Sequence, residues 1–201
     1  MCTAKERSAL EVTRCGWVNE DPLYIAYHDE EWGKPLYEDR KLFELLMLEG
    51  MQAGLSWYTI LKKRDRFRIA FDGFDPGIIV QYDEVKLEEL MNDSGIIRNR
   101  LKIDSIVRNA GVYLQICRDE GSFADYLWSF VGGEPRINHW EKRAEVPATT
   151  PWSDAMSKAL KKKGMKFVGS TICYAFMQSS GMVNDHTLNC FCRNSGLDPL
   201  R

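Results

Sequence analysis

The hydrophobic residues of this chain recur with the three- and four-residue spacing of helices, and no alternating run is long enough to predict a strand. Asp39 is a candidate N-cap for a helix through Leu48, and because apolar residues cover most of its circumference we expect this helix to be buried. The same spacing predicts further helices that begin after Ser56, after Asp83, near Leu101, after Ser122, after Ser153 and near Val168. The pattern therefore predicts an all-α fold of roughly eight helices.

Breaks in this pattern mark the connections. Residues 19–31 contain a proline and many polar residues, and residues 72–77 and 132–151 combine Gly, Pro and polar residues. We expect all three segments to be irregular. The polar run around Asp119 is also expected to be a loop. A short turn that contains Gly95 separates two helices within residues 87–110, which predicts a helical hairpin.

Composition narrows the class of protein. With 201 residues, 44% of them hydrophobic, the chain is long enough for one domain or two closely joined lobes. No apolar run reaches the ~18 residues of a membrane span, and the charged N-terminal residues do not resemble a secretory signal. We therefore expect a cytoplasmic protein with no membrane partner, whose six cysteines are thiols or metal ligands. The net charge of −2 excludes a polybasic protein but leaves local basic patches open.

Two pairs of candidate metal ligands stand at opposite ends of the chain. Cys15 and His28 form one pair, and His186 and Cys190 form the other. Together they have the composition of a closed, structural Cys₂His₂ zinc site. The second pair is four residues apart, so one helical turn would place both side chains on the same face. Such a site would tie the first segment of the chain to the last.

The spacing leaves alternatives to this ligand set. Buried free cysteines and hydrogen-bonded core histidines are common, and Cys192 and Cys2 are alternatives to the predicted cysteines. A catalytic zinc would need an open coordination position, and the chain has neither an HExxH motif nor a histidine-rich cluster. A metallohydrolase is therefore disfavoured.

Two basic clusters are candidates for contact with phosphate. The hairpin turn exposes the first amides of its second helix near Ile97, where Arg98, Arg100 and Lys102 add positive charge. The second cluster flanks Gly164 and contains Lys158, Lys161, Lys162, Lys163 and Lys166. An ordinary αα-hairpin and a solvated helix end are the alternatives. Two such clusters in a net-acidic protein favour one positive face that attracts nucleic acid locally.

Aromatic residues crowd the first segment of the chain and the helix after Ser56. They are Trp17, Tyr24, Tyr27, Trp32, Trp57 and Tyr58. Aromatic residues usually pack in the core, but here they also predict a pocket that would attract a cation or a flipped base. Glu49 follows a long apolar run, so its carboxyl group is buried and paired, faces that pocket, or is exposed at a helix end.

Five long stretches resemble the bacterial 3-methyladenine DNA glycosylase I family. In chain order they read RCGWVNEDPLYIAYHDEEWG, FELLMLEGMQAGLSWYTILKKR, SGIIRNRLKI, DYLWSFV and SKALKKKGMKFVGSTICYAFMQSSGMVNDH. They extend from about Arg14 to Cys190, nearly the whole chain. The resemblance implies a helix-hairpin-helix glycosylase fold of two helical lobes in residues 15–192, between a tail of residues 1–14 and a tail of residues 193–201.

The resemblance also implies roles for individual residues. One structural Zn²⁺ per chain would be held by Cys15, His28, His186 and Cys190. Glu49 would be the catalytic acidic group that recognises the base, and the base pocket would contain Tyr27, Trp57, Trp17, Tyr24 and Trp32. Leu55 would be the wedge that enters the base stack beside Gly54, and the other DNA contacts would be Gly95, Ile97, Arg98, Arg100 and Lys163.

The implied function is monofunctional hydrolysis of the N-glycosidic bond of 3-methyladenine in alkylated duplex DNA, within base excision repair. Free 3-methyladenine would be the product, and the protein would act as a monomer. No lysine occupies the hairpin position from which a Schiff base could form, so lyase activity is not expected. Two alternatives stay open: a non-catalytic, zinc-stabilised module that binds damaged DNA, and a zinc hydrolase of small nucleosides.

Overall fold

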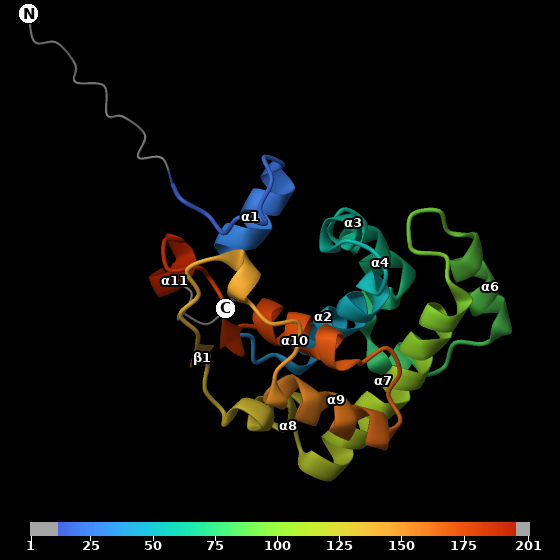
Figure 1. Ribbon diagram of the computed structural model, residues 1–201. Coiled ribbons are helices and arrows are strands. Elements are labelled where there is room, and N and C mark those ends of the chain that lie inside the picture. Colours follow the sequence, from blue (N-terminus) through green and yellow to red (C-terminus); the bar gives the residue numbers. More distant parts are fainter. Residues whose placement is uncertain (1–11, 196–201) are drawn as a thin grey trace, which may run out of the picture.

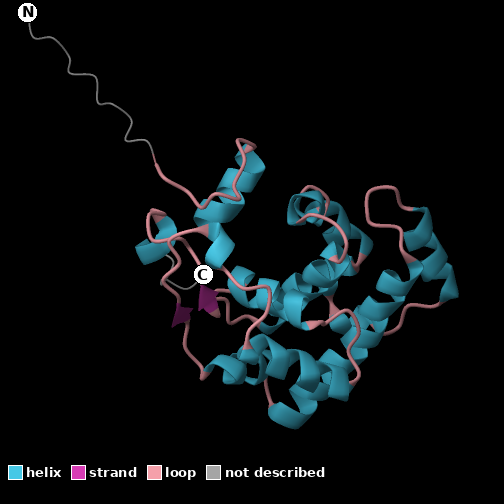
Figure 2. Cartoon of the chain, viewed as in Figure 1, coloured by secondary structure: helices cyan, strands magenta, loops and turns pink. Residues whose placement is uncertain are grey.

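The computed structural model describes residues 12–195. The expected tails therefore fall largely outside the described residues, as does Cys2, the alternative metal ligand. Within residues 12–195 the fold is mostly helical, as predicted (Figures 1 and 2). The α-helices are α1 (Pro22–Glu30), α2 (Asp39–Gln52), α3 (Trp57–Leu61), α4 (Arg64–Ala70), α5 (Pro76–Ile79), α6 (Glu84–Asn92), α7 (Arg100–Glu120), α8 (Phe123–Trp128), α9 (Pro151–Lys163), α10 (Ser170–Ser179) and α11 (Cys192–Ser195).

Short 3₁₀ helices and one pair of strands complete the described fold. The 3₁₀ helices are η1 (Asp72–Phe74), η2 (Ser129–Val131) and η3 (Arg143–Glu145). Strands β1 (Arg136–Ile137) and β2 (Val183–Asn184) pair in parallel, with Arg136 opposite Val183. Each strand has only two residues, so neither produces an alternating pattern in the sequence.

The predicted caps are confirmed at three helices and wrong at two. Ser56, Asp83 and Ser122 each accept a hydrogen bond from a backbone amide in the first turn of the helix that follows. Helix α2, however, starts at Asp39 itself, and the Asp39 carboxylate accepts hydrogen bonds from the amides of Phe123 and Ala124 at the start of α8 instead of capping α2. Helix α9 begins at Pro151 and is capped by Thr150, with Ser153 as the reciprocal partner of a capping box. Proline is favoured in the first turn because its fixed φ suits the helix and it has no N–H to satisfy.

Three segments expected to be irregular contain helices. Residues 22–30 form α1, because Asp21 caps its first turn and Pro22 starts it. Residues 72–79 contain η1 and α5, where Asp75 and Pro76 play the same two roles. Asp119 lies in the last turn of α7 rather than in a loop. With α1, α5 and the short helix α11 near the end of the described residues, residues 12–195 contain eleven α-helices, above the rough estimate of eight.

Helix α2 forms the centre of the core. Leu42, Phe43 and Leu46 on it are fully buried, and the helix contacts α3, α7, α8 and α10. The predicted hairpin is confirmed as α6, a turn and α7, and α7 continues past α5 to reach α8 (Figure 1). Helices α9 and α10 pack against each other beside α2, and α1 lies close to α11. None of the helices in residues 12–195 is long and apolar enough to cross a membrane.

Candidate functional site

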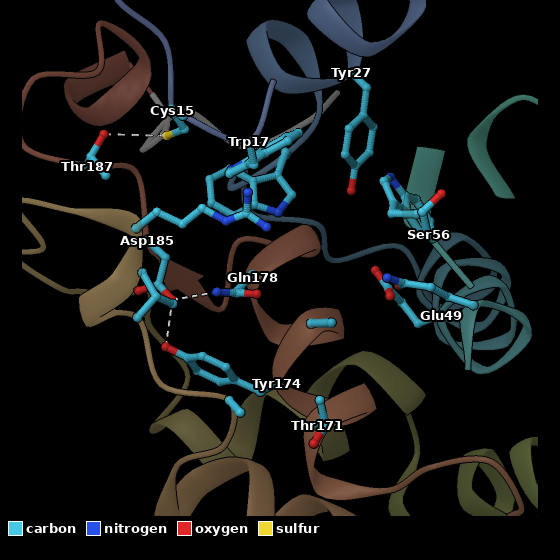
Figure 3. A pocket seen from close by; sticks show the side chains of 18 of the residues that line it. Cys15, Trp17, Tyr27, Glu49, Ser56, Thr171, Tyr174, Gln178, Asp185 and Thr187 are labelled. Carbon is cyan, nitrogen blue, oxygen red and sulfur yellow. Dashed lines mark hydrogen bonds between the residues drawn. The ribbon is translucent and has the colours of Figure 1, made fainter. Parts of the chain in front are cut away.

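A cavity of about 450 Å³ opens between α1, α2, α3 and α10. Its wall brings together all six residues predicted for a base pocket: Trp17, Tyr24, Tyr27, Trp32, Glu49 and Trp57. Figure 3 shows Tyr27 and Glu49 directed into this space from two different elements. Tyr58, which the sequence grouped with the same aromatic residues, is not part of the wall.

The aromatic side chains support one another around the cavity. The ring centres of Tyr27 and Trp57 are 5.4 Å apart, and Trp17 meets Trp32 edge to face at 5.0 Å. The indole Nε1 of Trp57 is buried and has no hydrogen-bond partner in the part of the chain that the structure describes. Aromatic faces attract planar bases and cations, and an indole N–H donates a hydrogen bond, so this wall suits a ligand that is flat and has a polar edge.

Glu49 lies in the last turns of α2 and is only 3% exposed. Its Oε1 accepts a hydrogen bond from Ser179 Oγ at 3.0 Å, whereas its Oε2 has no partner. Burial raises the pKa of Glu49 to about 8, although the bond from Ser179 acts in the opposite direction. Of the locations left open by the sequence, Glu49 therefore occupies the one in the wall of the pocket.

The opposite wall contains a buried carboxylate that the sequence analysis missed. Asp185 accepts hydrogen bonds from the Tyr174 hydroxyl at 2.6 Å and from Gln178 Nε2 at 2.7 Å (Figure 3). It also accepts from Asn138 Nδ2 at 2.7 Å and from Trp140 Nε1 at 2.8 Å. Four donors satisfy this carboxylate, so it fastens α10 to the connection that precedes α9. The only signal for this carboxylate in the sequence is that Asp185 directly precedes the predicted metal ligand His186.

The connection before α9 supplies a further part of the wall. Its contributions are Arg143, Val146, Pro147 and Ala148. The polar composition of this segment predicted only a loop. Hydrogen bonds from Asn138 and Trp140 to Asp185 help to hold this segment beside α10.

Two polar contacts hold α1 next to the helices that follow α2. The hydroxyl of Tyr58 donates to Asp21 Oδ2 at 2.5 Å, and Arg64 makes a two-pronged ion pair with Glu31 at 2.5 and 2.8 Å. Because Asp21 and Glu31 flank α1, these bonds position both ends of the helix that carries Tyr27. They keep that ring beside Trp57 on α3.

The four predicted metal ligands meet in one buried cluster. Their ligand atoms all lie within 4.8 Å of one another. Cys190 Sγ is 3.4 Å from His186 Nδ1 and 3.5 Å from His28 Nε2, and Cys15 Sγ is 3.5 Å from His186 Nδ1. Ligands ~2.0–2.3 Å from a tetrahedral ion are themselves about 3.5 Å apart. This buried Cys₂His₂ group could therefore hold a metal ion.

The other ring nitrogens of the two histidines are held from outside the cluster. His28 Nδ1 lies 2.7 Å from Asp29 Oδ1, and His186 Nε2 lies 3.2 Å from the backbone oxygen of Trp32. Such partners orient imidazole ligands toward a metal. Cys192 Sγ lies 3.9 Å from His28 Nδ1, on the outer side of that ring, so the geometry favours Cys190 as the fourth ligand.

The residues predicted to contact DNA are partly free and partly engaged within the protein. In the turn after α2, Gly54 has φ +77° and Leu55 is 43% exposed. Arg98 is exposed and has no hydrogen-bond or ion-pair partner among residues 12–195. Arg100, by contrast, pairs with Glu84 and Asp104, and Lys163 pairs with Glu120 at 2.9 Å.

Lys102 does not contribute positive charge to the surface, contrary to the sequence prediction. It is only 6% exposed, and its Nζ donates to the backbone oxygens of Met51 and Ala53. A run of basic residues does not reveal which side chain turns inward. Gly95 and Ile97 lie in the turn between α6 and α7, as predicted.

Comparison with known proteins gives a consistent result. A sequence model of the methyladenine glycosylase family matches residues 17–193. The chain is 54% identical to DNA-3-methyladenine glycosylase 1 of Escherichia coli, over 89% of this chain and 96% of that protein. It is 50% identical to the DNA-3-methyladenine glycosylase of Haemophilus influenzae, over 91% of this chain and 99% of that protein.

A solved structure shares the fold. It is that of 3-methyladenine DNA glycosylase I from Staphylococcus aureus, which describes 3-methyladenine recognition by that enzyme. It superposes with a TM-score of 0.87 at 37% identity and covers 90% of this chain and 96% of that one. Since one family model and these relatives each span nearly all of the described residues, the chain belongs to the methyladenine glycosylase family.

Proposed function

We propose that the protein is a monofunctional DNA glycosylase that removes 3-methyladenine from alkylated duplex DNA in base excision repair. The observation that carries this proposal is the aromatic cavity with two unpartnered polar atoms in its wall, Glu49 Oε2 and Trp57 Nε1. Its volume of about 450 Å³ is within the range of small-molecule sites and accommodates a purine base. Flipped bases are recognised by stacking and by hydrogen bonds to their edges, and this wall offers both.

Hydrolysis of the glycosidic bond of 3-methyladenine needs little chemical assistance from the protein. Methylation at N3 gives adenine a positive charge, so the bond from N9 to C1′ of the sugar is already weakened. Water bonds to C1′ and loses a proton, the N9–C1′ bond breaks, and its electron pair leaves with the base, which becomes neutral. The protein therefore contributes by selecting, unstacking and holding the base.

Glu49 is the residue that we assign to selection. Its free Oε2 would accept a hydrogen bond from the amino group of the base, while Ser179 holds the other oxygen. A cationic base would stabilise the carboxylate form of Glu49, and unmodified adenine, which is neutral, would not. Trp57 would stack on the base and Tyr27 would orient it.

The contacts with DNA are assigned to two turns. Leu55, exposed after Gly54, would take the place of the flipped base in the stack. The turn at Gly95 and Ile97 would present backbone amides to a phosphate, with Arg98 beside it. Arg100 and Lys163 would reach DNA only by exchanging their present carboxylate partners for phosphate.

We assign the Cys₂His₂ cluster to a structural zinc ion, one per chain. Four protein ligands fill a tetrahedral shell, so the ion would join segments of the chain and leave no position for a reactant. Residues 15–192 would then act as one glycosylase domain of two lobes, as a monomer.

The test is release of the base. Purified protein should liberate free 3-methyladenine from alkylated duplex DNA, measured by chromatography, well above spontaneous loss. Glu49→Gln should lower the single-turnover rate by roughly 10- to 100-fold, because it removes the charge that complements the lesion.

A matched variant controls for the change of charge. Glu38→Gln alters an exposed carboxylate at the start of the same helix and should leave the rate unchanged. If alkylated DNA is bound but no base is released, the protein is a damaged-DNA binding module instead.

A further inference from the structure

Lys102 is a buried lysine in the first turn of α7 whose ammonium group meets backbone oxygens rather than a carboxylate. Its Nζ donates to Met51 O at 2.8 Å and to Ala53 O at 2.6 Å. Desolvation lowers its pKa. It is absent from the wall of the base cavity, so it does not touch the position assigned to the base.

The end of α2 explains why these bonds matter. The last carbonyl groups of a helix have no partner within the helix. Here Gly50 O accepts from Ala53 N and Gln52 O accepts from Leu55 N, while Lys102 satisfies the oxygens of Met51 and Ala53. The positive charge also complements the negative end of the helix dipole. Lys102 thereby fixes residues 53–56, which we call the wedge turn because Leu55 stands out from it.

The same two parts of the molecule are joined a second time. Helix α3 starts directly after the wedge turn, and Lys63, the N-cap residue of the following helix α4, donates to Ser94 O at 2.9 Å. Arg66 in α4 pairs with Asp93 at 2.7 Å. Residues 93–99, which we call the hairpin turn, are therefore held from the wedge side.

Packing at Gly95 makes this second connection tight. A Cβ atom at Gly95 would lie 2.4 Å from Arg66 Cγ, so the two surfaces already touch. Lys102 thus completes a closed ring of contacts. The ring runs from the wedge turn through α3 and α4 to the hairpin turn, and then through α7 back to the wedge turn.

We propose that Lys102 is a positioning residue that sets the wedge turn at a fixed distance from the hairpin turn. The inference rests on the proposed function, in which the hairpin turn binds a phosphate and Leu55 enters the base stack. In a duplex, the phosphates and the stacked bases lie at a fixed distance from each other. If the hairpin turn and the wedge turn belong to one rigid unit, binding of a phosphate by the hairpin turn therefore places Leu55 where the flipped base leaves the stack. A displacement of about 1 Å in a positioning element can cost 100-fold in rate.

The central experiment compares duplex with single-stranded substrate. Lys102→Met keeps the length and the apolar stem of the side chain but removes the donor. It should lower kcat/KM on alkylated duplex DNA by roughly 10- to 100-fold. Excision from alkylated single strands needs no wedge, so it should change by less than about threefold, as should binding of free 3-methyladenine followed by tryptophan fluorescence.

A double-mutant cycle tests whether Lys102 acts through Leu55. If it does, Lys102→Met combined with Leu55→Ala should be no slower on duplex DNA than Leu55→Ala alone. Should the methionine variant fail to fold, Lys102→Gln retains an N–H donor on a shorter stem and should show a smaller loss with the same preference for single strands.

Asn109→Leu is the matched control. Asn109 is buried on the same helix and bonds the backbone of Lys166 at 2.8 and 2.9 Å, away from the wedge turn. This variant should lose stability without favouring single strands. Equal losses on duplex and single-stranded DNA in Lys102→Met, or losses that add to those of Leu55→Ala, would overturn the proposal. Absence of any excision by the wild-type protein would instead refute the proposed function.

Discussion

Glu49 owes its properties to the two different surroundings of its oxygens. Oε1 accepts a hydrogen bond from Ser179, and Oε2 is buried in the wall of the cavity without a partner among residues 12–195. Burial raises its pKa to about 8, so near neutral pH the acid form predominates in the free protein. A cationic base beside it would favour ionisation, and a neutral base would not. One side chain can thus couple its own charge to the charge of the base.

The raised pKa predicts how stability depends on pH. The folded protein binds the Glu49 proton more tightly than the unfolded chain does, so protonated Glu49 contributes to the free energy of unfolding. That contribution is fully present below the ordinary glutamate pKa and is lost as pH rises through about 8. Between about pH 5 and 9 the free energy of unfolding should fall by up to ~4 kcal/mol from this group. Denaturant titrations at several pH values measure it, and Glu49→Gln should flatten the curve.

The same ionisation should be visible in catalysis. For the wild-type protein, kcat/KM on alkylated DNA reports the pKa of the free enzyme, so it should rise toward a plateau above about pH 8. A pH profile of Glu49→Gln with the same rising limb would show that another group is responsible.

At the scale of elements, the segment after α10 is placed by close backbone contact. Gly33 N donates to Gln178 O, and Leu36 N donates to Ser180 O, so residues 33–36 run beside the end of α10. Gly181 has φ +71°, and a Cβ atom there would lie 2.2 Å from the carbonyl carbon of Lys34. This contact leads the chain into β2 and onward to Asp185, in the cavity wall.

Gly181→Ala should therefore be severely destabilising. The added methyl group meets backbone, which cannot rotate away, in addition to the strain of a positive φ. We expect a loss of more than ~3 kcal/mol in the free energy of unfolding, measured by denaturant titration.

Gly133→Ala separates the two causes. Gly133 has φ +84°, but a Cβ atom there would meet nothing within 4 Å. Its substitution should cost only about 1 kcal/mol from backbone strain. Similar losses in the two variants would mean that steric contact at Gly181 is unimportant.

At the scale of the whole molecule, the Cys₂His₂ cluster joins parts of the chain that are far apart in sequence. Cys15 and His28 belong to the first described segment and α1, and His186 and Cys190 lie just before α11. A backbone bond from Phe191 N to Thr13 O runs beside them, and Figure 1 shows α1 close to α11. Closing so long a loop restrains both segments that shape the cavity.

Metal content and stability should therefore change together. Elemental analysis should find about one zinc per chain, and Cys190→Ser should lose it. From the loop-closure entropy alone, we expect the free energy of unfolding of this variant to be lower by about 4 kcal/mol. Calorimetry would measure this loss of stability as a lower Tm.

Cys173→Ala is the control for loss of a buried cysteine. Cys173 is fully buried but lies outside the cluster, so its substitution should leave the zinc content unchanged. A fully folded wild-type preparation without metal would contradict the structural assignment.

Local signals in the sequence were sufficient where the cause is local. The caps at Ser56, Asp83 and Ser122 were predicted correctly because each accepts from an amide within its own first turn. The cap of α9 was misplaced because Thr150 and Ser153 are both plausible caps, and the proline between them decided the start. Helix α1 was missed because it has only nine residues and its apolar residues are not gathered on one face.

Interactions between distant segments were beyond the reach of these signals. The four donors to Asp185 come from two segments that precede it by up to 47 residues. Lys102 looked like a surface charge because the sequence around it is basic, and only its burial against α2 shows otherwise.

By itself, the sequence determined the helical class and the hairpin and, through resemblance, the Cys₂His₂ group that could hold a metal ion and the six residues that line the cavity together. Periodicity, capping and residue chemistry depend on residues that are close together in the sequence, so they can be recognised without coordinates. Only the tertiary structure determined that one oxygen of Glu49 has no partner among the described residues, that four donors bind Asp185, and that Lys102 links α7 to the end of α2. Those features depend on which side chains lose water when distant segments pack together, and burial of that kind has no local signature.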